Sequence, residues 1–175
     1  IALDNTSVSE EVLAANVGVL TITDPDDGDS VTYTVSDTRF EVTNGQLKLK
    51  AGKKLDYETE QSVSVNITAT DSGGLSRTET FNISVTDAAD PTIALSNLTL
   101  IDNVVGESVG SLSMTNGVSG VTYSYSVSDT RFEVVNGTLK LKDNQNSWFE
   151  IEPSLNLTIS VSGSDGSSYS KAFTI

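Results

Sequence analysis

The sequence predicts an all-β protein that contains two Greek-key β-sandwiches in series, each of about seven strands. Three observations support this fold class: an internal repeat along the whole chain, segments in which apolar and polar residues alternate, and turn sequences between those segments. The 175 residues suffice for one large domain or two small ones, because soluble domains cluster at about 100–150 residues. The internal repeat favours two.

The repeat has a displacement of 92 residues and continues without a gap through both copies. Residues 35–50, VSDTRFEVTNGQLKLK, return as residues 127–142, VSDTRFEVVNGTLKLK. Self-similarity at a fixed spacing is typical of repeated structural units. We therefore expect a first domain at residues 1–87, a linker at 88–92 and a second domain at 93–175.

Each copy has the sequence pattern of antiparallel strands. Apolar and polar residues alternate in four segments of the first copy, which is the pattern of half-buried strands; these segments are residues 31–35, 47–50, 63–69 and 81–85. The dipeptides Asn44-Gly45 and Asn136-Gly137 accept the positive φ angles that a tight hairpin turn requires. Helical periodicity is nearly absent.

Composition excludes most catalytic machinery and makes nucleic acid an unsuitable partner. The chain has 24 acidic and 10 basic residues, a net charge of −14, so it repels nucleic acid and anionic membranes. Without His or Cys it cannot form a Ser-His-Asp triad, a thiol nucleophile, a disulfide or a zinc finger. We expect a protein that is not an enzyme and whose charge favours cations.

No segment of the sequence has the length and apolar character of a membrane span or the pattern of a signal peptide. The sequence begins at Ile1 without Met and stops inside an expected strand at Ile175. We therefore expect this chain to be part of a longer protein, with no membrane insertion in this part.

Acidic residues of the first copy gather where strands end. They are Glu10, Asp24 and Asp26, Asp56 and Glu58, Asp71, and Asp87 and Asp90. Clustered carboxylates repel at short range unless a cation lies between them. Calcium takes six to eight oxygen ligands in irregular geometry and suits such a loop-built site.

The order of these motifs resembles a cadherin repeat, and the details resemble the cadherin-like repeats of large bacterial surface adhesins and polysaccharide-associated proteins. The motifs are Val8-Ser9-Glu10, Asp24-Pro25-Asp26, Leu55-Asp56-Tyr57-Glu58, Ala69-Thr70-Asp71 and Asp87-Ala88-Ala89-Asp90-Pro91. The resemblance covers the whole first copy, whereas the second copy matches mainly through the internal repeat. It implies a cadherin-like or immunoglobulin-like sandwich.

The resemblance also implies calcium ligands. In cadherins Ca²⁺ lies between successive domains, and the domain before the junction supplies residues that correspond here to Glu10, Asp56, Glu58, Asp87 and Asp90. The domain after a junction supplies residues that correspond to Asp24, Asp26 and Asp71, which in the first copy face whatever domain precedes it. The first copy is thus expected to have two metal-binding ends.

The second copy departs from this pattern. At the corresponding positions Asp24, Asp26 and Asp71 become Asn116, Val118 and Gly163, while Glu10, Asp56 and Glu58 become Asp102, Trp148 and Glu150. We therefore expect one or two ions at the junction, held mainly by the first copy and the linker. We expect no tight metal site at the far end of the second copy.

The resemblance implies an extracellular or cell-surface adhesion module that binds another surface protein or a second copy of the same protein, with Ca²⁺ making the junctions rigid. Two alternatives remain open. One is a polysaccharide-binding accessory module, with the aromatic residues Trp148, Tyr123, Tyr125 and Tyr169 as candidates. The other is a passive spacer.

Overall fold

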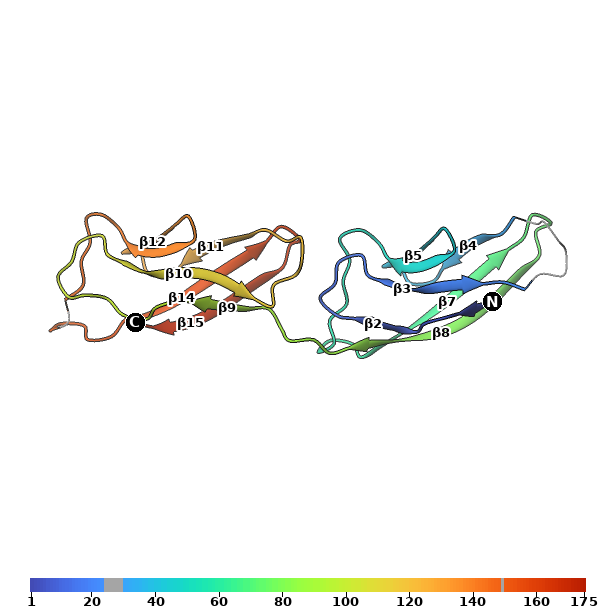
Figure 1. Cartoon of the computed structure of the whole chain (residues 1–175), viewed down its shortest axis with the longest axis horizontal. Helices are drawn as coiled ribbons and strands as arrows, with labels where there is room; N and C mark the ends of the chain where they lie inside the picture. Colours follow the sequence, from blue (N-terminus) through green and yellow to red (C-terminus); the bar gives the residue numbers. More distant parts are fainter. Residues whose placement is uncertain (24–29, 149) are drawn as a thin grey trace. The chain divides into compact units, whose positions relative to one another are not determined.

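A computed structural model describes residues 1–23, 30–148 and 150–175. It divides into two compact units, Ile1–Ala89 (unit 1) and Asp90–Ile175 (unit 2). The described residues form strands, turns and loops without a helix, which confirms the expected all-β class (Figure 1). None of the described residues forms a helix with the length and apolar character needed to cross a membrane.

Unit 1 consists of two four-stranded sheets. Its strands are β1 (Ala2–Leu3), β2 (Ser7–Ser9), β3 (Asn16–Thr21), β4 (Thr32–Val35), β5 (Phe40–Thr43), β6 (Gln46–Leu49), β7 (Ser62–Thr70) and β8 (Ser76–Thr86). One sheet has the order β1-β3-β6-β5 and the other β2-β8-β7-β4. The chain crosses from one sheet to the other between β1 and β2, β2 and β3, β3 and β4, β4 and β5, and β6 and β7, as in a Greek-key sandwich. All pairings are antiparallel except that of β2 with β8.

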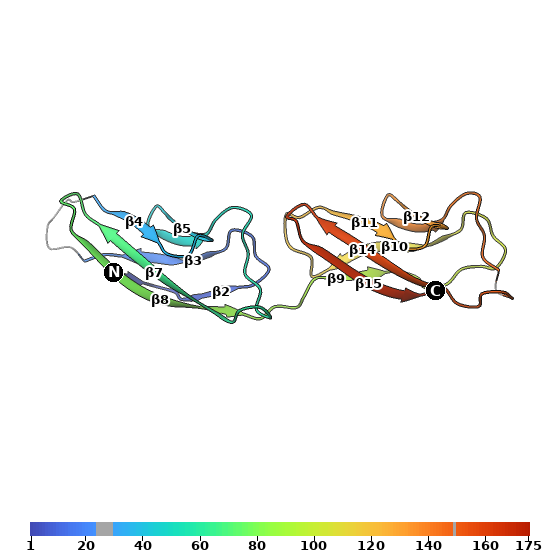
Figure 2. The same cartoon turned by 180° about the vertical axis from the view of Figure 1, so that it is seen from behind.

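Unit 2 repeats this arrangement with one fewer strand among its described residues. Its strands are β9 (Thr92–Leu95), β10 (Ser108–Thr115), β11 (Tyr123–Val127), β12 (Phe132–Val135), β13 (Thr138–Leu141), β14 (Asn156–Gly163) and β15 (Ser168–Thr174). The sheets have the orders β9-β10-β13-β12 and β11-β14-β15. The paired strands β14 and β15 lie side by side in Figure 2. Residues 99–101, which correspond to β2, are not in a strand.

Each unit has its own hydrophobic core between its two sheets. In β7 the side chains at Val63, Val65 and Ile67 are buried, and the residues between them are exposed. These side chains pack against residues of the opposite sheet such as Phe40 and Leu47. Unit 2 has an equivalent cluster from β9, β10, β12, β13 and β14. The alternating pattern in the sequence is therefore the pattern of core-facing side chains.

Two tight turns link β5 to β6 and β12 to β13. Asn44 and Gly45 have φ angles of 52° and 72°, and Asn136 and Gly137 have 50° and 75°. Positive φ at both central residues produces the turn twist that matches two antiparallel strands. The expected hairpin turns are confirmed.

An ion-pair cluster precedes β5 and recurs before β12. The Arg39 side chain donates to Asp37 from Nε at 3.1 Å and from Nη2 at 2.7 Å. It also pairs with Glu60. These hydrogen bonds lower the pKa of the Asp37 carboxyl below its ordinary value and raise the pKa of Arg39. Because Asp37 has this lowered pKa only in the folded state, the free energy of unfolding of unit 1 depends on pH.

A glycine in β3 allows the loop after β1 to approach closely. A Cβ atom at Gly18 would lie 2.6 Å from Oδ1 of Asp4 and 2.8 Å from the carbonyl oxygen of Asn5. The same Asp4 atom accepts a hydrogen bond from the backbone N–H of Val19 at 2.7 Å. Gly110 has the corresponding close contacts in unit 2. This contact fixes the path of the loop between β1 and β2.

The substitution Gly18→Ala should lower the free energy of unfolding of unit 1 by about 1–3 kcal/mol, because the added methyl group overlaps backbone atoms that cannot move independently. Urea denaturation followed by circular dichroism measures the effect. Gly73→Ala is the matched control, since its Cβ would meet only Asp71 Oδ1 at 3.4 Å. Equal effects of both substitutions would contradict the close-packing argument.

The substitution Asp37→Asn should destabilise unit 1 at pH 7, and the destabilisation should shrink progressively as the pH falls below the unfolded-state pKa of about 3.9. The folded-state pKa is lower than the unfolded value of about 3.9, so the stabilisation is present above that value and is lost as pH falls through the folded-state pKa. Denaturation of both proteins across this range tests it. A destabilisation that does not change with pH would show that the Asp37 charge is not responsible.

Candidate functional site

The buried carboxylate of Glu10 follows β2 directly and is bonded to two other segments of unit 1. Glu10 is 1% exposed. Its Oε2 accepts a hydrogen bond from the backbone N–H of Tyr57 at 2.6 Å, and its Oε1 accepts one from the backbone N–H of Ala88 at 2.7 Å. A buried carboxylate needs such donors to offset the loss of hydration. Glu10 thereby joins the end of β2 to the turn after Leu55 and to the chain that leaves β8.

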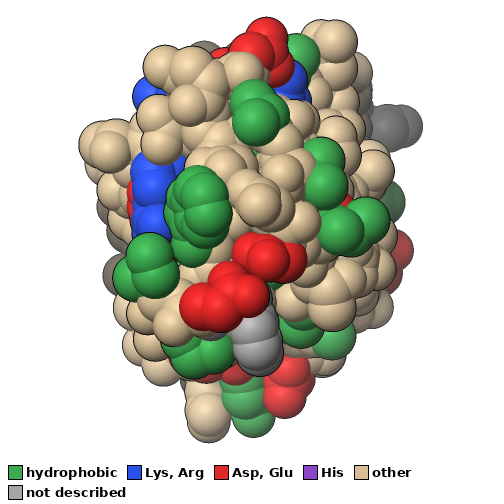
Figure 3. Space-filling model, turned by 90° about the vertical axis from the view of Figure 1, so that its left-hand side faces the viewer, with side chains coloured by type: hydrophobic (Ala, Val, Ile, Leu, Met, Phe, Trp, Pro, Cys, Tyr) green, Lys and Arg blue, Asp and Glu red, His purple; other side chains and the backbone are tan. Residues whose placement is uncertain are grey.

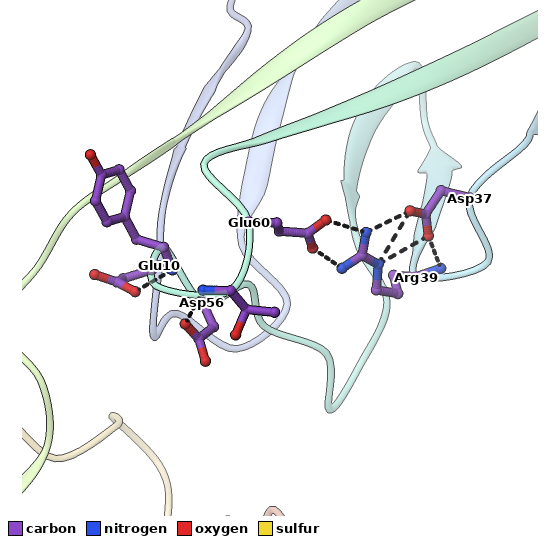
Figure 4. Close-up of polar contacts among 7 residues, drawn as sticks. Glu10, Asp37, Arg39, Asp56 and Glu60 are labelled. Carbon is purple, nitrogen blue, oxygen red and sulfur yellow. Dashed lines mark hydrogen bonds and ion pairs between the residues drawn. The ribbon is translucent and has the colours of Figure 1, made fainter.

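The turn at residues 56–60 places two further carboxylates beside Glu10. The backbone N–H of Glu60 donates to the carbonyl of Asp56 at 2.9 Å. The N–H of Thr59 donates to Oδ1 of Asp56 at 3.0 Å (Figure 4). One carboxylate oxygen from each of Glu10, Asp56 and Glu58 lies within 4.8 Å of the others. Asp56 and Glu58 are exposed, so this group, the carboxylate triad, is accessible from solvent.

The charge of the carboxylate triad suits a hard divalent cation. Within the part of the chain that the structure describes, no Lys or Arg forms an ion pair with Glu10 or Asp56. The nearby Lys54 pairs with Glu11. Carboxylates this close repel one another unless positive charge lies between them. Three carboxylates with two oxygens each provide the donor type and much of the ligand number that Ca²⁺ requires.

The two acidic residues expected as ligands near the linker, Asp87 and Asp90, differ in their neighbours. Asp87 is exposed and lies between Thr86, whose carbonyl accepts a hydrogen bond from the N–H of Glu10, and Ala88, whose N–H donates to Glu10. Its backbone is therefore fixed next to Glu10, although its carboxylate is not in the triad. Asp90 is exposed and opens unit 2, where its carbonyl accepts a hydrogen bond from Asn116 at 3.3 Å.

The expected ligands at the other end of unit 1 are described only in part. Asp71 follows β7, and its Oδ1 accepts a hydrogen bond from the backbone N–H of Leu75 at 2.8 Å. Asp24 and Asp26 lie outside the described residues.

Unit 2 has a different set of side chains where unit 1 has the carboxylate triad. Asp102, Trp148 and Glu150 are all exposed, and Trp148 is 50% exposed. Neighbouring Ile101 and Ile151 are 66% and 81% exposed. Figure 3 shows hydrophobic side chains beside acidic ones on the corresponding face of the molecule. The buried acceptor that organises the site in unit 1 is thus replaced by an exposed residue.

One carboxylate that the sequence comparison did not identify lies at the opposite end of unit 2. Oδ1 of Asp165 accepts a hydrogen bond from the backbone N–H of Ser167 at 3.1 Å. Ser167 corresponds to Leu75, so Asp165 occupies the role that Asp71 has in unit 1. A Cβ at Gly163 would lie 2.4 Å from this oxygen. In unit 2 the acidic residue lies two positions later than in unit 1. A comparison of corresponding positions therefore shows only that Asp71 is replaced by Gly163.

Comparison with known proteins identifies the first repeat. A family model described as the cadherin domain matches residues 4–86. The Drosophila melanogaster protein "Protocadherin-like wing polarity protein stan" is 40% identical over 78 residues, which make up 41% of this chain and 2% of that protein.

Solved structures of cadherin ectodomains are also similar to the chain. Human protocadherin-24 EC1-2 is 23% identical, with coverage of 100% of this chain and 95% of that chain and a TM-score of 0.44. Chicken VE-cadherin EC1-2 is 20% identical, with coverages of 96% and 93% and a TM-score of 0.41. The chain spans 48% of the solved protocadherin gamma B7 segment, at 22% identity over 99% of this chain and a TM-score of 0.40.

The match of the family model to residues 4–86 covers unit 1 from the loop after β1 to the end of β8. The first repeat is therefore similar to a cadherin domain, which confirms the resemblance predicted from its motifs.

Proposed function

We propose that this chain is a calcium-binding module of an extracellular adhesion protein. Unit 1 binds Ca²⁺ through Glu10, Asp56 and Glu58, and Asp87 and Asp90 supply further oxygens from the chain that follows β8. The observation that carries the proposal is the convergence of the three carboxylates within 4.8 Å around a buried glutamate. The cadherin domain assignment supports it, since calcium binding is a general property of such domains.

Calcium, when bound, would supply positive charge between the three carboxylates. The residues of unit 1 hold the proposed ligands in place. Glu10 is held by the N–H groups of Tyr57 and Ala88, so a ligand at Glu10 is connected through two hydrogen bonds to the turn and to the linker. Binding to this ordered arrangement stabilises it by mass action and reduces the conformations open to residues 87–90. The predicted consequence is a stiffer chain at the exit from unit 1.

The proposed site at the other end of unit 1 uses Asp71 together with Asp24 and Asp26. It would serve a domain that precedes unit 1 in a longer protein. Unit 2 has no counterpart of the carboxylate triad with a buried glutamate among its described residues. We propose that one or two ions bind near the linker and that the far end of unit 2 binds none tightly.

The proposed partner is another cell-surface protein or a second copy of this chain. The cadherin domain supports an adhesive role outside the cell, and the net charge of −14 argues against nucleic acid. The matched segment spans 2% of the Drosophila relative.

Calcium should raise the melting temperature of the whole chain, by the equivalent of about 2.7 kcal/mol when free calcium is 100 times Kd. Asp56→Asn should remove most of this increase. Without calcium the same substitution should leave the melting temperature unchanged or raise it, because one charge leaves the triad while Oδ1 can still accept from Thr59. Scanning calorimetry with calcium and with a chelator measures both effects.

The matched control is Glu150→Gln, since Glu150 corresponds to Glu58 in the unit without the triad. It should leave the calcium response intact. A wild-type melting curve that does not respond to millimolar calcium would contradict the proposed function.

If the partner is a second copy, sedimentation velocity of the whole chain should show a faster species in calcium and only monomer with a chelator. Monomer under both conditions would exclude self-association of this chain and leave a different surface protein as the partner.

A further inference from the structure

We infer that Arg39 is a positioning residue that sets the calcium affinity of the carboxylate triad without contacting the ion. The inference rests on the proposed function. Arg39 lies just before β5 and reaches the turn that carries Asp56 and Glu58 through its ion pair with Glu60.

The Arg39 guanidinium connects the loop between β4 and β5 to this turn (Figure 4). On one side it donates to both oxygens of Asp37, and the backbone N–H of Arg39 also donates to Asp37 at 2.9 Å. On the other side Nη1 and Nη2 donate to the two oxygens of Glu60, the latter at 3.3 Å. A planar guanidinium fixes distance and orientation together, because two parallel hydrogen bonds allow little rotation.

The turn at residues 56–60 is consequently held at both ends. Its first end is fixed by the bond from the N–H of Tyr57 to Glu10, and its last end by the pair between Glu60 and Arg39. Asp56 and Glu58 lie at this turn, between β6 and β7. Groups that orient metal ligands commonly contribute a factor of about 10–100 to metal affinity. Loss of Arg39 removes the side-chain anchor of Glu60, while the backbone bond from the N–H of Val85 to the carbonyl of Gln61 after the turn remains.

Unit 2 contains the same ion-pair cluster without the triad. Arg131 donates to Asp129 at 2.6 Å and to Glu152 at 2.7 Å. The N–H of Glu152 donates to the carbonyl of Trp148 at 2.9 Å, so the turn has the same form. Arg131 therefore provides a control in which the structural part of the cluster is present and the calcium ligands are changed.

Electrostatics and positioning predict opposite effects of removing Arg39. The arginine carries a positive charge, so its replacement by a neutral residue makes the surroundings of the triad more negative. Coulomb attraction alone would then strengthen calcium binding. Positioning predicts weaker binding, because Asp56 and Glu58 lose their fixed arrangement. The sign of the change separates the two.

The test is isothermal titration of calcium chloride into the whole chain for wild type, Arg39→Gln, Arg39→Lys and Arg131→Gln, at a temperature where all four are folded. Arg39→Gln should raise Kd about tenfold. Arg39→Lys keeps the charge but not the fork, so its Kd should lie between those of wild type and Arg39→Gln. Arg131→Gln should lower the melting temperature and leave Kd unchanged.

Terbium luminescence provides a second readout that a general loss of stability does not change. Lifetimes in H₂O and D₂O count the water molecules on bound Tb³⁺, and this count should rise in Arg39→Gln because water replaces a displaced carboxylate oxygen. If Arg39→Gln does not fold, the calcium Kd and the water count are measured on Arg39→Lys.

Wild-type Kd and an unchanged water count in both Arg39 variants would overturn this inference but would not contradict the proposed calcium site. A wild-type chain that takes up no calcium would overturn the proposed function and this inference with it.

Discussion

The buried carboxylate of Glu10 is the constraint on which the candidate site depends. A carboxylate that is 1% exposed has to be offset by hydrogen bonds or by positive charge, and here two backbone N–H groups from separate segments supply the bonds. These bonds set where the turn at residues 56–60 begins and where the linker leaves β8. The exposed acids Asp56 and Glu58 are then held next to a carboxylate that cannot move away. Their mutual repulsion is the physical reason to expect a cation at this end of unit 1.

The two units show that the sandwich and the site at its end are separable. Both have the same Asn-Gly turns, the same arginine cluster and the same order of strands, except that the described residues of unit 2 contain no strand corresponding to β2. These features depend on core-facing side chains and on turns, which the repeat retains. The residues that follow the strands are not part of the hydrophobic clusters and differ between the units, as in Glu10 against Asp102 and Asp56 against Trp148. A common scaffold can therefore carry a cation site in one copy and an exposed, partly apolar surface in the other.

Much of this architecture could be predicted from the sequence, because strands and tight turns leave local signals. Residues 63–69 alternate in the sequence and lie within β7, and Asn44-Gly45 has the backbone angles that its composition predicts. Glu10, Asp56 and Glu58 could be chosen as candidates from their motifs, and the structure brings these three together. The pair of Arg39 with Glu60 and the displaced acid Asp165 could not be predicted. The first joins residues 21 positions apart with no pattern between them, and the second fills the place of Asp71 from a different position. Both contacts depend on how far a side chain reaches in space. A comparison of positions 92 residues apart does not contain this information.

The most direct measurement is the anomalous diffraction of crystals of the whole chain grown with terbium in place of calcium. We expect an anomalous peak coordinated by Glu10, Asp56 and Glu58, with metal–oxygen distances of about 2.3–2.6 Å. A triad surrounded only by water in such crystals, or a peak at Glu150 instead, would show that the triad does not bind the ion.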